Sequence, residues 1–196
     1  MPMPKKAGNA PADLARLKAA WVREWPGALA TWSRFVQLAP PRWCLSRADE
    51  QREGLAGSFA AIRLADHAVV VSLVQVRSLG LDRFARQILA HEIGHHVLAP
   101  ADLADHARLA ARTRAALPGR AHQAGFIANL YTDLLINDRL QRIAGLDLAG
   151  VYRTIGKEAA ADPLWTLYMR IYEILWGLPA RTLTSGAVDS RTAGDA

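Results

Sequence analysis

The chain has 196 residues, of which 51% are hydrophobic, and a formal net charge of +6. This length suits one domain, and the hydrophobic fraction can supply a core, which excludes wholesale disorder. A single cysteine excludes a disulfide scaffold and a cysteine-rich zinc module, so any bound metal must rely on histidine and carboxylate ligands.

The N-terminal half is predicted to contain two helices followed by short strands. Residues 1–10 read as a flexible leader. Apolar residues at helical spacing predict one helix over 11–25 and a second that begins at Pro26 and stops at Pro40 and Pro41. The apolar period then changes, and three short strands are expected: Arg42 to Ser46, Phe59 to Leu64 and the Val-rich run Ala68 to Val76.

The C-terminal half is predicted to be helical. The expected helices cover 82–98, 102–116, 121–143, 150–160 and 163–176. Residues 178–196 read as a disordered tail. The fold class is therefore α+β and mostly helical, with a small sheet before the helix over 82–98, in a single domain over 11–177. No Gly-rich loop follows a strand, which disfavours a nucleotide-binding fold.

Charge and hydropathy disfavour two classes of partner. The first ten residues have no apolar segment of a secretory signal, and the most apolar run, Ala68 to Val76, is far shorter than the ~20 residues that span a bilayer. We therefore expect a soluble, cytoplasmic protein without a membrane partner. The 20 arginines are scattered and accompany no nucleic-acid motif, so a solvated basic surface is favoured over a nucleic-acid interface.

The motif His91-Glu92-Ile93-Gly94-His95 is the sharpest chemical signal. Positions i and i+4 share one helix face, so two imidazoles there can bind one Zn²⁺. Glu92 can then act as the base for a metal-bound water. Phe84, Ile88, His91, His95 and Leu98 form one stripe that is predicted to face the interior. His96 is expected on another face as a packing or surface residue.

A catalytic zinc needs a third protein ligand. Ala101 stands where metzincins place a third histidine, and no glutamate occurs between Glu92 and Glu158. Asp133 is the favoured candidate, because it is predicted to lie in an apolar stripe, with Asn129 and Asn137 at i−4 and i+4 as supporting amides. The stripe consists of Phe126, Leu130, Ile136 and Leu140 besides the two asparagines. His122 is the runner-up ligand, and Glu158 and Glu173 are further alternatives.

Two segments of the chain together resemble a known family. The segment 91–95, HEIGH, and the segment 129–138, NLYTDLLIND, resemble the metallopeptidase domain found with von Willebrand A-like domains in bacteria, whose pattern is HExxH followed by NxxxDxxIND. The resemblance covers about residues 84–143. It implies a zincin-type, minigluzincin-like fold, with Asp133 as third ligand and Asn137 as a supporting residue. The active-site helix is also similar to that of the ImmA/IrrE zincins.

The predicted function is that of a zinc-dependent metallopeptidase with one Zn²⁺ per chain. His91, His95 and Asp133 hold the ion, and Glu92 passes a proton from water to the leaving amine. By analogy with zincins, the strand 68–76 is expected to border the cleft and pair with an extended peptide substrate. Candidates for binding the oxyanion or the substrate are Tyr131, His122, Tyr152 and Arg139. His67, in the turn before the strand, is expected to face solvent.

Two other function classes stay open. One is a non-catalytic adaptor that keeps zinc for structure and acts with von Willebrand A or MoxR-type ATPase partners; the intact Glu92 argues against it. The other is a basic protein that associates with nucleic acid, for which steep salt-dependent binding would be the sign.

Overall fold

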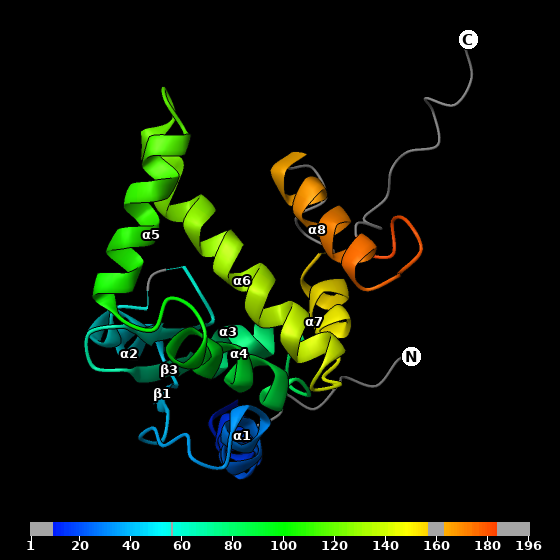
Figure 1. Cartoon of the computed structure of the whole chain (residues 1–196). Coiled ribbons are helices and arrows are strands. Elements are labelled where there is room, and N and C mark those ends of the chain that lie inside the picture. Colours follow the sequence, from blue (N-terminus) through cyan, green and yellow to red (C-terminus); the bar gives the residue numbers. More distant parts are fainter. Residues whose placement is uncertain (1–9, 56, 157–162, 184–196) are drawn as a thin grey trace, which may run out of the picture. The chain divides into compact units, whose positions relative to one another are not determined.

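The computed structural model describes residues 10–55, 57–156 and 163–183 (Figure 1). These residues form mainly helices, with one three-stranded mixed sheet placed before the helix that carries the HExxH motif, which confirms the predicted α+β class. The chain divides into two compact units, Met1–Ala107 and Arg108–Ala196. The leader predicted over 1–10 lies, but for its last residue, outside the described residues. The prediction of a single domain over 11–177 stays a prediction.

One long helix, α1 (Ala10–Trp32), opens the first unit, where the sequence predicts two helices. The predicted break is wrong, because the helix continues through Pro26. A proline inside a helix costs about 3 kcal/mol. Contacts on both sides of the proline offset this cost: apolar side chains of α1 are buried before and after it, and the Trp32 indole donates to the Ala90 carbonyl at 2.7 Å.

The strands that follow form one sheet with β3 at its centre. They are β1 (Arg42–Cys44), β2 (Ala60–Arg63) and β3 (Ala68–Ser72). β3 pairs in parallel with β1 and antiparallel with β2, and the turn 64–67 joins β2 to β3 as predicted. Val69, Val70 and Val71 are at most 1% exposed, which agrees with a strand covered on both faces.

The central place of β3 contradicts one expectation. A strand accepts an added peptide only through unpaired backbone groups at a sheet edge. β3 is paired on both sides, so it is not a surface for substrate pairing. The edges of the described sheet are β1 and β2.

The Val-rich run ends as a strand earlier than predicted, because Ser72 starts a helix. The residues expected to continue the strand to Val76 belong to α3 (Leu73–Ser78). The backbone N–H of Gln75 donates to Ser72 Oγ at 3.1 Å, which is a helix N-cap bond. Leu73 and Val76 are both buried in α3, so the apolar residues suit a helix as well as a strand.

A short helix, α2 (Arg47–Glu53), lies where the sequence predicts no element. The backbone N–H of Asp49 donates to Ser46 Oγ at 3.2 Å, and Gly54 ends the helix with a φ of 72°. Both end signals are present in the sequence. The helix buries none of its side chains, so no apolar period predicts it.

The two motif histidines lie on α4 (Ala85–Val97), inside the predicted range 82–98. α4 packs against α1 and β2 and is buried on most sides. The predicted inward stripe is correct for Phe84, Ile88 and His95. The prediction is wrong for Leu98, which is 41% exposed, because this residue follows the last residue of the helix.

The C-terminal half contains the predicted helices with small shifts at their ends. They are α5 (Leu103–Ala116), the 3-10 turn η1 (Ala121–Gln123), α6 (Ala124–Arg142), α7 (Leu148–Ile155) and α8 (Pro163–Leu175). α6 packs against α7 and α8, and aromatic side chains of α7 and α8 fill much of the core of the second unit. Among the described helices, none combines the length and the apolar character that a membrane crossing requires.

A buried carboxylate holds the chain that follows α8. Glu173 is fully buried; it accepts hydrogen bonds from the backbone N–H groups of Arg181 and Leu183 at 3.1 and 2.9 Å, and from the Arg170 guanidinium at 3.0 Å. Burial raises the pKa of Glu173, but these bonds lower the pKa more, so it lies below its ordinary value. Leu183 is 2% exposed, so residues 178–183 differ from the predicted disordered tail, whose remainder lies outside the described residues.

Replacing Glu173 with glutamine is expected to lower the free energy of unfolding by about 2 kcal/mol at neutral pH, because a charged acceptor of three hydrogen bonds is lost. Since folding lowers this pKa, the stabilisation is present above the unfolded value of about 4.3 and is lost as the pH falls through the folded value. Urea unfolding at pH 7 and at about pH 3 measures both effects.

The matched control is Glu24→Gln, which removes an exposed ion pair with Arg86 and should cost less than about 1 kcal/mol. A Glu173→Gln cost that is the same at both pH values would contradict a stabilising charge at this position.

Candidate metal centre

Two histidines one helical turn apart form the first part of the site. His91 and His95 lie on α4, at positions that share a helix face. Their ring centroids are 4.9 Å apart, with ring planes at 88°. His95 is buried and His91 is half-buried, so both rings are largely shielded from water.

The backbone just after α4 orients the His95 ring. Its Nδ1 lies 3.0 Å from the carbonyl oxygen of Ala99. Because a carbonyl oxygen only accepts hydrogen bonds, Nδ1 carries the proton, and Nε2 keeps the lone pair that can bind a metal. A backbone or carboxylate partner of this kind accompanies most metal-binding histidines.

Glu92 follows His91 directly on α4 and is only 6% exposed. A carboxylate with so little access to water needs compensating hydrogen bonds or charges. Its place between the two histidines in the chain is the one expected for a base that takes a proton from a metal-bound water. The role of Glu92 as a base stays a prediction.

Asp133 lies on α6, at the margin of the buried face of that helix. The predicted apolar stripe is only partly correct: Ile136 and Leu140 are buried, whereas Phe126 is 55% exposed. Asp133 itself is half-buried and Asn129 is exposed. Nδ2 of Asn129 donates to Oδ2 of Asp133 at 3.0 Å. One of the two amides expected to support this carboxylate therefore contacts it.

The second amide, Asn137, contacts tyrosines. Asn137 is 1% exposed, and its Nδ2 donates to the hydroxyls of Tyr152 at 2.7 Å and Tyr172 at 2.8 Å. The Tyr168 hydroxyl lies 2.7 Å from that of Tyr172. Asn137 thus joins α6 to α7 and α8 inside the second unit. The expectation that Asn137 supports Asp133 stays a prediction.

The tyrosine cluster lies close enough to Asp133 to be affected by its charge. Burial raises the pKa of the Tyr152 phenol, and Tyr172 and then Asp133 raise it further. Burial, Tyr152 and Asp133, in that order, also raise the pKa of Tyr168. Both hydroxyls therefore remain protonated at neutral pH. Of the candidates for oxyanion binding, Tyr152 is the one in this cluster.

The other predicted site residues lie in exposed positions or outside the described residues. Tyr131 is 52% exposed, and Arg139 and His122, the latter in η1, are also exposed. Glu158 lies outside the described residues. Asp138 on α6 accepts a hydrogen bond from the Arg142 Nε at 2.6 Å.

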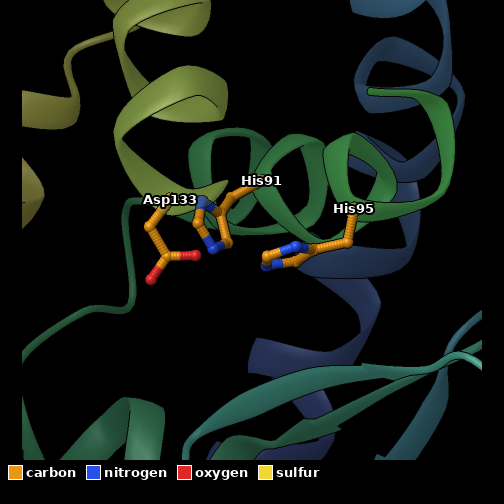
Figure 2. A group of neighbouring side chains, drawn as sticks. All are labelled: His91, His95 and Asp133. Carbon is orange, nitrogen blue, oxygen red and sulfur yellow. The ribbon is translucent and has the colours of Figure 1, made fainter. Parts of the chain in front are cut away.

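One group of three potential metal ligands stands out among the described residues: His91, His95 and Asp133, whose ligand atoms all lie within 4.8 Å of one another. Figure 2 shows these three side chains. Donors about 2 Å from one ion are no more than roughly 4 Å apart, so small side-chain adjustments suffice for them to share an ion. Two imidazoles and one carboxylate form a ligand set typical of catalytic zinc.

A second histidine pair is missed by the sequence analysis. The ring centroids of His67 and His96 are 4.4 Å apart. The expectation that His67 faces solvent is wrong, since it is half-buried. Burial and then the charge of His67 lower the pKa of His96, against an opposing hydrogen bond to the backbone of Ala101. The two residues meet only because the turn after β2 packs near the end of α4, and no spacing in the sequence indicates this.

No family model, curated protein or solved structure matches the chain. The resemblance to the bacterial metallopeptidase domain therefore depends on the HExxH and NxxxDxxIND motifs alone. Its implications for fold family and activity remain expectations.

Proposed function

We propose that the protein is a zinc-dependent peptidase. The observation that carries the proposal is the grouping of His91, His95 and Asp133 within 4.8 Å, with the buried carboxylate of Glu92 next to His91 in the chain. Two imidazoles, a carboxylate ligand and an adjacent base are the parts that metal-assisted hydrolysis requires. A zinc site with a purely structural role has no use for the base.

Each residue has one task in the proposed reaction. His91, His95 and Asp133 hold one zinc ion per chain. Zinc supplies a Lewis acid, which polarises the peptide carbonyl and makes water more acidic. Glu92 accepts a proton from the attacking water and donates it to the amine that leaves when the C–N bond breaks. The Ala99 carbonyl keeps His95 in the tautomer that binds metal.

An extended substrate is expected to add to β2 rather than to β3. β2 is an edge strand of the described sheet, and it packs against α4, the helix of His91 and His95. Backbone groups at a sheet edge can pair with an extended peptide. Because β2 covers only Ala60–Arg63, this pairing would involve a short stretch of substrate. The expected compartment is the cytoplasm.

The test begins with the unmodified full chain. Metal analysis of the purified protein should find one zinc ion per chain. A chelator should remove the zinc and the activity together, and added zinc should restore both. Activity is measured on a broad panel of unstructured peptides and proteins. Stoichiometric zinc without any cleavage, also after addition of a von Willebrand A or MoxR-type partner, would favour the non-catalytic adaptor. Steeply salt-dependent binding to nucleic acid, without cleavage, would favour the third function.

Replacing Asn129 with alanine is expected to weaken zinc binding about tenfold while leaving the fold intact. Asn129 is exposed, and its amide donates to Oδ2 of Asp133. Losing a hydrogen bond to a ligand typically costs 10- to 100-fold in metal affinity, and water replaces part of this bond at an exposed site. Competition with a zinc-binding dye measures the change. Gln123→Ala, at the exposed start of the same helix, is the control, and equal zinc affinity in wild type and Asn129→Ala would contradict this role.

A further inference from the structure

The second histidine pair of the first unit does not belong to the proposed peptidase centre. His67 lies in the turn between β2 and β3, and His96 lies in the last turn of α4. Their ring centroids are 4.4 Å apart and the rings are tilted by 50°. The ring centroids of His91 and His95 are 4.9 Å apart, so the second pair is at least as close as the first.

Each ring of this pair has a nitrogen without a partner. Nε2 of His67 and Nδ1 of His96 are both buried, and neither forms a hydrogen bond. Leaving a buried polar atom unsatisfied is costly, and native proteins rarely do so without an ion or a water molecule at that point. Two such nitrogens on adjoining rings indicate a ligand that binds both.

The chemistry of the two unpartnered atoms shows which ligand is suitable. Imidazole nitrogens are common ligands of transition metals. An ion bound between the adjoining rings would satisfy both Nε2 of His67 and Nδ1 of His96, which otherwise have no partner.

His67 is held in an unusual backbone conformation. Its φ is 53°, in the left-handed region, which few residues other than glycine adopt. Strained conformations of this kind persist where the surrounding structure demands them, often at binding sites. Here the conformation accompanies the contact of the imidazole with His96.

We propose that His67 Nε2 and His96 Nδ1 bind a second metal ion, a divalent transition metal that favours imidazole, such as Zn²⁺ or Cu²⁺. Water completes the coordination, because no third His, Cys, Asp or Glu joins these two among the described residues. The ion links the β2–β3 turn to the end of α4. This site is independent of the proposed peptidase centre.

Equilibrium dialysis of the metal-free full chain against Zn²⁺, and separately against Cu²⁺, followed by metal analysis, tests the proposal. The His91→Ala/His95→Ala variant removes the first site and should still bind one ion, which raises its melting temperature. Adding His67→Asn should abolish this binding and the thermal shift. Asparagine tolerates the left-handed conformation, so the variant should keep the melting temperature of the metal-free parent. His96→Gln tests the second ligand.

His106→Gln, on α5, is the control and should change nothing. The proposal is overturned if the His91→Ala/His95→Ala variant binds no ion, or if His67→Asn and His96→Gln leave its binding unaltered; water alone would then satisfy the two nitrogens. Failure of the peptidase proposal looks different, because it concerns the ion that disappears with His91 and His95.

Discussion

Replacing Glu92 with glutamine is expected to lower peptide hydrolysis about 1,000-fold and to leave the zinc content at one per chain. Removing a positioned base or acid typically costs 10²- to 10⁴-fold. Glutamine has nearly the same shape as glutamate, so at a position that is 6% exposed it preserves packing but cannot take a proton from water. Initial rates on a cleaved peptide, together with metal analysis of the same samples, measure the two effects separately.

Glu24→Gln, at an exposed site on α1, is the matched control and should retain full activity. Activity of Glu92→Gln within a few fold of wild type would remove Glu92 as the base. Loss of zinc along with activity would instead show that the buried carboxylate is needed to build the site.

Replacing Asp133 with alanine is expected to reduce zinc affinity at least ~100-fold. Loss of one hydrogen bond to a ligand already costs up to that factor, so loss of a direct ligand should cost no less. Because Asp133 is half-buried at the margin of α6, the truncation leaves little empty space, and the protein should unfold with an unchanged midpoint when metal is absent. Zinc competition assays and thermal unfolding without metal check the two statements.

Three further variants make this test decisive for the third ligand. Asp138→Ala removes a neighbouring carboxylate that pairs with Arg142 and should keep zinc affinity. His122→Ala and Glu158→Ala address the alternatives drawn from the sequence. If either of these releases zinc while Asp133→Ala retains it, Asp133 is not the ligand. Glu173 needs no such variant, because its carboxylate is engaged by backbone N–H groups.

The helices could be predicted well because their apolar residues repeat at the helical period. The ends of α5 and α6 lie within a few residues of the prediction. The errors arise where something other than period decides. Pro26 predicts a break, but the indole of Trp32 and the packing of α1 on α4 keep the helix continuous. The run after β3 contains β-branched and apolar residues that predict a strand, but the hydroxyl of Ser72 caps a helix there.

The candidate site also has parts that could be predicted from the sequence and parts that could not. The spacing of His91 and His95 can be read from the sequence because one helix face sets their distance. The same reasoning names Asp133, which is also the residue grouped with them in the structure. The contacts of Asn137 with Tyr152 and Tyr172 join separate helices, and no local pattern predicts them.

The position of β3 has a consequence for how the protein would aggregate. The side chains of Val69 to Val71 are buried, and their strand is paired with β1 on one side and β2 on the other. The strand ends at Ser72, where the sequence alone would extend it. Short, uncharged, β-branched segments are those that pair between chains when they are exposed. Partial opening of this sheet would therefore expose its best-protected strand as a nucleus for aggregation. Slow aggregation of the protein on storage is thus expected to begin in the first unit.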